Sequence, residues 1–274
     1  MSTPTVQQAG LEARNLSLGY EGKTIIESLS LAVPNTHVTS VIGPNGCGKS
    51  TLLRGLGRLL APQSGDVFLD GTPLRRQSTR HVATRVSVLP QTPRAPSGLT
   101  VADLVSRGRH PRQKWYQQFS TSDESAVEWA LAATDILELA DMPLEDLSGG
   151  QRQRAWISMT LAQETGILLL DEPTTYLDLA HQVDLLELVR TLNREHGRTV
   201  VMVLHDISLA ARYSDHIVAM KDGRIVAQGS PAEVITPERL LDVFGLAARV
   251  VPEPTEGRPH VIPLGTVDTL PADA

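Results

Sequence analysis

Five short, almost wholly apolar runs recur along the chain: VTSVI (38–42), VSVL (86–89), ILLLD (167–171), TVVMVL (199–204) and HIVAM (216–220). They lack polar alternation, which is typical of strands covered on both faces, as in a parallel sheet. Residues 180–195 instead repeat apolar positions at three-residue spacing and end before the stop signal Gly197. The alternation of strands with helices predicts an α/β fold.

Two regions differ from this pattern. Residues 11–36 and 66–80 carry shorter alternating pieces with turn signals, which predicts an antiparallel β lobe. Residues 100–165 contain no convincing strand, and the stretch from 121 opens with cap-type residues and carboxylates before a helical pattern. We therefore predict an inserted helical segment of about 60 residues.

The chain from residue 250 onward is rich in proline. Its HVIPL stretch (260–264) is expected to add a short edge strand, and residues 266–274 are expected to be loosely ordered. We expect one domain over residues 11–250, with a β lobe and core at 11–92 and 166–250, a helical subdomain at about 93–165, and a tail at 251–274.

Composition narrows the function classes. The 274 residues can bury a sizeable core, and the net charge of −6 argues against non-specific nucleic-acid binding as the main role. The one cysteine, Cys47, excludes an internal disulfide and fits a reducing compartment. No apolar run approaches the ~18 residues of a membrane span, and the N-terminus lacks a signal-peptide core. We expect a soluble chain that reaches a membrane only through a partner.

Basic residues gather in one part of the sequence. They are Arg75, Arg76, Arg80 and Arg85, then Arg107, Arg109, Arg112 and Lys114. The favoured interpretation is a solvated face. The alternative is a surface for a partner or for the anionic inner leaflet.

The segment GPNGCGKS at 43–50 matches the pattern G-x-x-x-x-G-K-[ST] between a predicted strand and a predicted helix. In this arrangement the backbone N–H groups of residues 46–50 surround the β-phosphate, Lys49 neutralises phosphate oxygens, and the Ser50 hydroxyl ligates Mg²⁺. A glycine turn with an incidental lysine is the alternative, which the two flanking elements disfavour. The predicted nucleotide-binding residues are Gly43, Pro44, Asn45, Gly46, Cys47, Gly48, Lys49, Ser50 and Thr51.

Cys47 lies in this loop, close to a helix N-terminus and to Lys49. Both features stabilise a thiolate, so its pKa is expected to fall below the usual value. The alternative is a buried, inert thiol.

A pair of carboxylates follows the apolar run ILLL. Asp171 is placed to reach Mg²⁺ through water, and Glu172 to act as general base on the attacking water. A plain strand-end turn would be the better interpretation of an isolated pair. Downstream of a phosphate loop, the pair predicts phosphoryl chemistry.

The segment LSGGQRQRA at 147–155 predicts a second anion-ready helix N-terminus, with Ser148 as N-cap and Gly149–Gly150 allowing close backbone approach. The stretch resembles the signature motif of ATP-binding-cassette (ABC) ATPases, whose other motifs occur in the same order as in this chain. The resemblance covers about residues 11–245. It implies a P-loop NTPase core with a mainly parallel sheet, an antiparallel β lobe and an inserted α-helical subdomain.

The resemblance also assigns roles to residues outside these segments. Tyr20 resembles the aromatic residue that stacks on adenine, although an exposed strand-end tyrosine is an open alternative. Gln91 resembles the glutamine that senses Mg²⁺ and the attacking water, and Asp178 the aspartate that communicates between subunits. His205 resembles the histidine that contacts the γ-phosphate. The implied catalytic residues are thus Glu172, His205 and Gln91, and the implied Mg²⁺ ligands Ser50, Gln91 and Asp171.

In that family ATP is held between the phosphate loop of one subunit and the signature motif of a second subunit. The residues Ser148, Gly149, Gly150 and Gln151 would then serve the neighbour's nucleotide. This implies ATP and Mg²⁺ as cofactors and a second copy of the chain as partner. It also implies a membrane permease docked through the helical subdomain, an extracytoplasmic binding protein acting indirectly, a location on the cytoplasmic face of the membrane, and no nucleic acid.

The finer resemblance is to import ATPases for ferric siderophores, with haem and cobalamin importers close by. It is carried by segments such as GRHPRQ, DEPTTYLDLAHQVDLLELV and LHDISLAARYSDHIVAMKDGRIVAQG. A soluble ABC ATPase acting on ribosomes or DNA is the first alternative, but neither a second cassette nor a long coiled-coil insertion is visible. A P-loop kinase or GTPase is the second, and it leaves LSGGQ, LHD and TTYLD unexplained.

Overall fold

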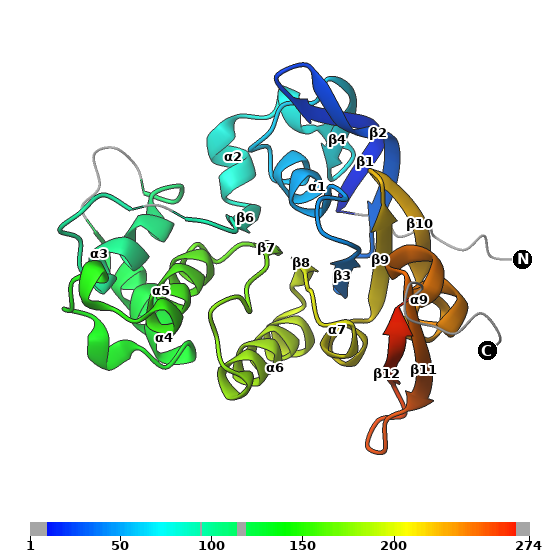
Figure 1. Ribbon diagram of the computed structural model, residues 1–274. Helices are drawn as coiled ribbons and strands as arrows, with labels where there is room; N and C mark the ends of the chain where they lie inside the picture. The colour runs from blue at the N-terminus through cyan, green and yellow to red at the C-terminus, as the bar shows by residue number, and fades with distance from the viewer. Residues whose placement is uncertain (1–9, 94, 114–118, 267–274) are drawn as a thin grey trace, which may run out of the picture. The chain divides into compact units, whose positions relative to one another are not determined.

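The computed structural model describes residues 10–93, 95–113 and 119–266. They fall into two compact units (Figure 1). The first unit combines the chain up to Arg76 with the chain from Val201 onward, and the second runs from Gln77 to Val200.

An antiparallel sheet of four strands in the order β2-β1-β4-β5 forms one part of the first unit. Its strands are β1 (Leu11–Tyr20), β2 (Lys23–Val33), β4 (Ser64–Leu69) and β5 (Thr72–Pro73). Buried leucines such as Leu11, Leu16 and Leu18 recur along β1, as expected for a strand with one covered face. The predicted antiparallel β lobe is confirmed.

The predicted β character is wrong beyond Pro73. The chain instead forms η1 (Leu74–Arg76) and α2 (Thr79–Ala83). The hydroxyl of Ser78 caps α2 by accepting a hydrogen bond from the His81 N–H at 3.1 Å. This hydrogen bond stabilises the N-terminus of a helix, so the segment forms a helix and does not pair as a strand.

Parallel strand pairs occur in both units. In the first, β3 (Val38–Ile42) pairs with β9 (His216–Lys221), which pairs antiparallel with β10 (Arg224–Gly229). In the second, β6 (Val86–Leu89) pairs with β7 (Ile167–Asp171). The strand β8 (Thr199–Val203) crosses the unit boundary along the chain. All residues of β3, β7 and β8 are buried, which confirms the strands predicted from apolar runs.

The remaining elements of the first unit are helices and a strand pair. They are α1 (Lys49–Leu56), α7 (Ile207–Tyr213), α8 (Pro231–Val234), α9 (Pro237–Phe244), β11 (Leu246–Pro252) and β12 (Pro259–Thr266). The strands β11 and β12 form a separate antiparallel pair (Figure 1), so the strand predicted around HVIPL is confirmed. Residues 267–274, where loose order was expected, lie outside the described residues.

Helices dominate the second unit. Besides α2, they are α3 (Val101–Ser106), η2 (Arg107–Arg109), α4 (Thr121–Ala133), η3 (Leu137–Leu139), η4 (Leu144–Asp146), α5 (Gly149–Ala162) and α6 (Leu179–His196). Among the described residues of 100–165, strand-type pairing is limited to one bridge between Thr100 and Pro143. The predicted helical segment is confirmed, as is the stop at Gly197, whose φ of 61° ends α6.

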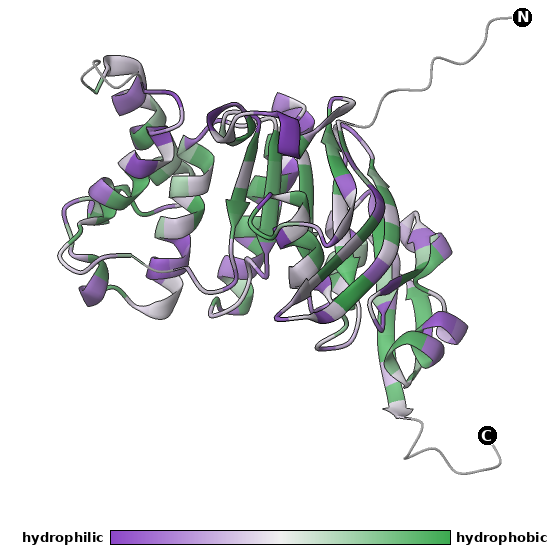
Figure 2. Cartoon of the chain, turned by 90° about the horizontal axis from the view of Figure 1, so that it is seen from above, coloured by the Kyte–Doolittle hydropathy of each residue, from purple (hydrophilic) through white to green (hydrophobic). Residues whose placement is uncertain are grey.

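Hydrophobic residues concentrate on the strands, while polar residues gather on turns and on outer sides of helices (Figure 2). None of the helices in the described ranges combines the length and apolar character needed to cross a membrane.

Candidate functional site: a nucleotide cradle and a capped signature helix

The phosphate loop joins the buried strand β3 to the N-terminus of α1 in the first unit. Gly48 immediately precedes α1 with a φ of 103°, a conformation that L side chains rarely adopt. A side chain at Gly43 would meet the Met220 carbonyl oxygen at 2.2 Å. These glycines let the loop turn tightly and bring it to the helix end, where the first backbone N–H groups have no intrahelical partner and suit an anion.

Lys49 lies inside this loop and is 5% exposed. Its ammonium group donates to the carbonyl oxygens of Gly43 at 2.8 Å and Pro44 at 2.9 Å. These bonds hold a positive charge over the turn, beside the helix N-terminus. Ser50 and Thr51 follow in the first turn of α1.

The expectation of a lowered pKa for Cys47 is wrong. Its side chain is buried, and burial raises the pKa of the thiol more than the nearby Lys49 ammonium lowers it. Because desolvation disfavours the thiolate, the structure favours the alternative of a buried thiol for this residue.

His205 lies near the start of the phosphate loop. The Leu204 N–H donates to the Val41 carbonyl oxygen at 3.4 Å, so the chain leaving β8 runs beside the end of β3. His205 is exposed and directly precedes Asp206, whose carboxylate accepts from the Leu209 N–H at 2.8 Å and caps α7. The packing of β8 on β3 thus brings His205 and the loop to one edge of the first unit.

Tyr20 is the last residue of β1 and is exposed. Its hydroxyl accepts a hydrogen bond from Arg54 Nη1 at 3.2 Å. Arg54 belongs to α1, so the tyrosine is tied to the helix that begins at the phosphate loop. Sequence reasoning missed Arg54, because no local pattern pairs two residues so far apart in the chain.

Asp171, Glu172 and Gln91 gather at one strand edge of the second unit. The parallel pairing matches Leu89 of β6 with Leu170 of β7, so Asp171, which ends β7, and Gln91, which follows β6, lie at the carboxyl ends of neighbouring strands. Asp171 is 2% exposed. Ligands of α/β proteins bind at this edge of a sheet.

Glu172 leaves β7 with a φ of 53°, which is unusual for a residue other than glycine. The turn after it is closed by the Thr175 N–H, which donates to the Glu172 carbonyl oxygen at 3.2 Å. The Thr175 hydroxyl also donates to the Glu172 carboxylate at 3.4 Å. These two bonds from Thr175 hold both the backbone and the carboxylate of Glu172 in the turn.

Ser148 caps α5, as predicted. Its hydroxyl accepts from the Gln151 N–H at 3.2 Å, and the Gln151 side chain accepts from the Ser148 N–H at 2.9 Å. This reciprocal arrangement is a capping box. The sequence carries its signal, Ser-x-x-Gln, but the prediction used only the serine. The box fixes the orientation of the first turn, which contains Gly149 and Gly150.

The loop 173–178 lies against the start of α5. Gln153 donates to the Pro173 carbonyl oxygen at 3.1 Å, and a side chain at Gly150 would lie 3.5 Å from the Tyr176 carbonyl oxygen. A hollow of about 460 Å³ results, lined by Ser148, Gly149, Gly150, Gln151, Arg154, Tyr176, Leu177, Asp178 and His181. The structure thus brings the signature residues and Asp178 together, and adds Tyr176 and His181, which the sequence analysis did not single out.

Asp178 caps α6 and pairs with His181. Its Oδ1 accepts from the His181 N–H at 3.0 Å and lies 2.7 Å from His181 Nδ1. These bonds from the backbone and ring of His181 hold the pKa of Asp178 below its usual range.

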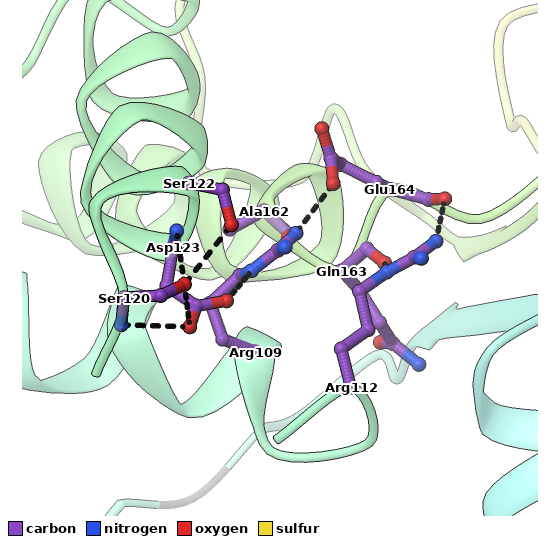
Figure 3. A network of polar contacts seen from close by, with 8 residues as sticks. All are labelled: Arg109, Arg112, Ser120, Ser122, Asp123, Ala162, Gln163 and Glu164. Carbon is purple, nitrogen blue, oxygen red and sulfur yellow. Dashed lines mark hydrogen bonds and ion pairs between the residues drawn. The ribbon is translucent and has the colours of Figure 1, made fainter. Parts of the chain in front are cut away.

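The basic residues that were expected to form a solvated face are not all exposed. Arg109 is 4% exposed and donates to the carboxylates of Asp123 at 2.8 Å and Glu164 at 2.6 Å, and to the Ala162 carbonyl oxygen at 2.7 Å (Figure 3). Exposed Arg112 donates to the Gln163 carbonyl oxygen at 2.9 Å. The favoured interpretation is therefore wrong for Arg109, because folding places two carboxylates around it. Exposed Arg107 retains a solvent-facing position, and Lys114 lies outside the described residues.

A phosphate loop, then a capped Leu-Ser-Gly-Gly-Gln helix start, then a strand-end Asp-Glu pair define an ABC-type ATPase. The model of the ABC transporter family matches residues 26–175, just over half of the chain, and the chain belongs to this family. It carries the ATPase domain of that family.

Individual relatives agree with this assignment. The chain is 49% identical over 270 residues to the ferric enterobactin transport ATP-binding protein FepC of Escherichia coli (strain K12), covering 98% of this chain and 99% of that protein. It is 52% identical over 255 residues to the achromobactin transport ATP-binding protein CbrD of Dickeya dadantii (strain 3937), covering 93% and 95%. The dimeric post-hydrolysis structure of the ATP-binding cassette MJ0796, bound to ADP and Pi, is similar with a TM-score of 0.72, 27% identity and coverage of 80% and 98%.

Proposed function

We propose that the chain is the ATP-hydrolysing subunit of a membrane importer for ferric siderophores. One structural observation carries the ATPase part: the buried Lys49 ammonium, held by the Gly43 and Pro44 carbonyl oxygens at the N-terminus of α1. The near full-length similarity to FepC and CbrD supports the choice of cargo. The cargo assignment rests on that similarity, since no motif of this chain is assigned to cargo recognition.

The site residues divide the work of hydrolysis. The backbone N–H groups at the start of α1 and the Lys49 ammonium bind the phosphates, and Tyr20 takes the adenine ring. Glu172 accepts a proton from the attacking water, and His205 donates to the γ-phosphate.

The donor set of Ser50, Gln91 and Asp171 fits Mg²⁺. It consists of hydroxyl, amide and carboxylate oxygens, which this hard cation prefers, and the Asp171 carboxylate lies buried at a strand end, where a cation stabilises its charge. When bound, Mg²⁺ neutralises charge on the β- and γ-phosphate oxygens.

Two copies of the chain act together in the proposal. Ser148, Gly149, Gly150 and Gln151 of one copy bind the γ-phosphate held by the other, with Asp178 beside them. The hollow between the capped α5 start and the loop 173–178 supports this arrangement, as does the dimeric form of the similar cassette MJ0796. We further propose that the domain spans residues 11–250, with residues 251–274 as a tail. Its helical subdomain, at about 93–165, docks on a permease at the cytoplasmic face of the membrane, and an extracytoplasmic binding protein supplies the cargo.

Uptake by the whole transporter tests the proposal. Cells or vesicles carrying the chain with its permease are given a panel of labelled ferric siderophores, haem and cobalamin. The proposal expects ATP-dependent uptake of a ferric siderophore that is lost with Glu172→Gln. Uptake of haem or cobalamin alone would contradict the cargo assignment, and uptake that persists with Glu172→Gln would contradict the motor role.

A further inference from the structure

Tyr20 occupies the end of a tightly turned hairpin. The turn residues Glu21 and Gly22 have φ values of 47° and 81°, as in a type I′ turn, and Tyr20 pairs with Lys23 across it. The turn fixes the backbone, but the Tyr20 side chain is 39% exposed. Backbone geometry alone therefore does not hold the ring in one orientation.

Gln63 holds the backbone of the same hairpin from another side. Its N–H donates to the Ser17 carbonyl oxygen at 2.8 Å, and its side-chain oxygen accepts from the Thr24 hydroxyl at 3.0 Å. A side chain at Gly19 would lie 2.7 Å from the Gln63 amide nitrogen, so Gly19 leaves room for this contact. Gln63 thus positions the strands of the hairpin through Ser17 and Thr24. The ring of Tyr20 is held by a different residue.

That residue is Arg54. Its Nη1 donates to the Tyr20 hydroxyl at 3.2 Å. Arg54 stands five residues after Lys49 on α1, about 7.5 Å along a helix of ordinary rise. One rigid element thus carries both the phosphate-binding ammonium and the donor that fixes the tyrosine hydroxyl.

We propose that Arg54 is a positioning residue for the nucleotide base: through its hydrogen bond to Tyr20 it holds the ring in the orientation that stacks on adenine, at a fixed distance from the phosphate loop. The inference rests on the proposed function, in which Tyr20 takes the adenine ring. Arg54 supports the base-dependent part of the affinity and leaves phosphate binding unchanged, because its contact is to the tyrosine.

The test compares ATP with inorganic tripolyphosphate, which lacks the base. Binding of each is measured by calorimetry on the purified full chain carrying Glu172→Gln, which prevents hydrolysis. Arg54→Ala and Tyr20→Phe are each expected to weaken ATP binding by about 3- to 10-fold, the usual worth of one hydrogen bond, with tripolyphosphate affinity unchanged. The double variant should be no weaker than either single variant, and Arg54→Lys should recover part of the loss.

Arg14→Ala serves as the matched control, because Arg14 is an arginine on β1 whose exposed ion pair with Glu12 spans 2.6 Å. It should leave both affinities unchanged. Equal weakening of ATP and tripolyphosphate by Arg54→Ala would overturn the inference, as would unchanged ATP affinity while Tyr20→Ala weakens it. If Tyr20→Ala itself has no effect on ATP binding, the adenine assignment within the proposed function fails as well.

Discussion

At the scale of single residues, Glu172 combines two features that suit a general base. It follows the buried Asp171 directly, and its backbone takes a positive φ of 53°, which is unusual for a residue other than glycine. Strained backbone of this kind persists where the surrounding structure fixes it, and it concentrates at functional sites. The bonds from Thr175 to the carbonyl and carboxylate of Glu172 provide that fixation here.

Glu172→Gln should therefore retain ATP binding and lower hydrolysis by about 10²- to 10⁴-fold, because the amide keeps the shape but accepts no proton. Phosphate release and nucleotide affinity measured on the same preparation check this. Glu195→Gln, at an exposed position of α6, is the control and should hydrolyse ATP normally. Near wild-type hydrolysis by Glu172→Gln would show that another group activates the water.

Cys47 provides a second residue-scale prediction. Because burial raises the pKa of its thiol, maleimide should label the folded chain far more slowly than the unfolded chain at neutral pH. Cys47→Ser should hydrolyse ATP at close to the wild-type rate, since backbone N–H groups do the phosphate binding. Labelling that is equally fast before and after unfolding would mean an accessible thiolate.

At the scale of elements, Arg109 ties the chain after α3 to two other helices. It bonds Asp123 in the first turn of α4, and it bonds Ala162 and Glu164 at the end of α5 (Figure 3). Asp123 also accepts from the Ser120 N–H and hydroxyl, which completes the cap of α4. The start of α4 and the end of α5 thus share one buried guanidinium.

Arg109→Ala should destabilise the chain by about 3–5 kcal/mol, because it leaves the Asp123 carboxylate without its buried cation. Thermal or urea unfolding measures the loss. Arg75→Ala is the matched control: its ion pair with Asp66 spans 2.7 Å but is largely exposed, so removal should cost about 0–1 kcal/mol. Similar losses for the two variants would indicate that the Arg109 network contributes no more than a surface pair.

The same network predicts a pH dependence. Burial alone would raise the pKa of Asp123, but the bonds from Arg109 and Ser120 outweigh it and hold the pKa below the usual value. A carboxylate with a lowered folded-state pKa contributes stability above its unfolded pKa and loses it as the pH falls through the folded value. The melting-temperature gap between wild type and Asp123→Asn should be full at about pH 6 and narrow below about pH 4. If the difference in melting temperature does not change with pH, Asp123 does not contribute to the loss of stability at low pH.

At the scale of the whole molecule, the chain has two helix N-termini that are suited to bind an anion. The start of α1 carries Lys49, and the start of α5 carries the capped Ser148 with two glycines. One nucleotide occupies one phosphate loop, so in the proposed function the second helix end serves a nucleotide on another copy. We therefore propose that two copies of the chain must pair for ATP hydrolysis.

Mixing two inactive variants tests that requirement. Lys49→Ala and Ser148→Arg should each lack ATPase activity, whereas their mixture should recover part of it, because one of the two shared sites regains both residues. Phosphate release by the mixture measures the recovery. The chain carrying both changes, mixed with either single variant, is the control and should stay inactive. Absence of recovery in a mixed dimer that demonstrably forms would contradict independent shared sites.

Part of the fold could be predicted because its signals are local. The almost wholly apolar runs at β3, β7 and β8 identified buried strands, and Gly197 identified the end of α6. The helix α2 was missed because a single capping serine, Ser78, outweighed a weak strand pattern. Tyr176 and His181 were missed as site residues because only the packing of the loop 173–178 on α5 brings them beside Ser148.

The sequence by itself determined the nucleotide chemistry of this protein. A phosphate loop, a strand-end Asp-Glu pair and a capped helix start are each built from neighbours along the chain, so their order and spacing suffice to identify them. The tertiary structure alone decided the environment of particular side chains: the buried Cys47 thiol, the carboxylates around Arg109 and the bond from Arg54 to Tyr20. Burial and charge pairing depend on groups far apart in sequence, and only the folded chain brings such groups within a few ångströms.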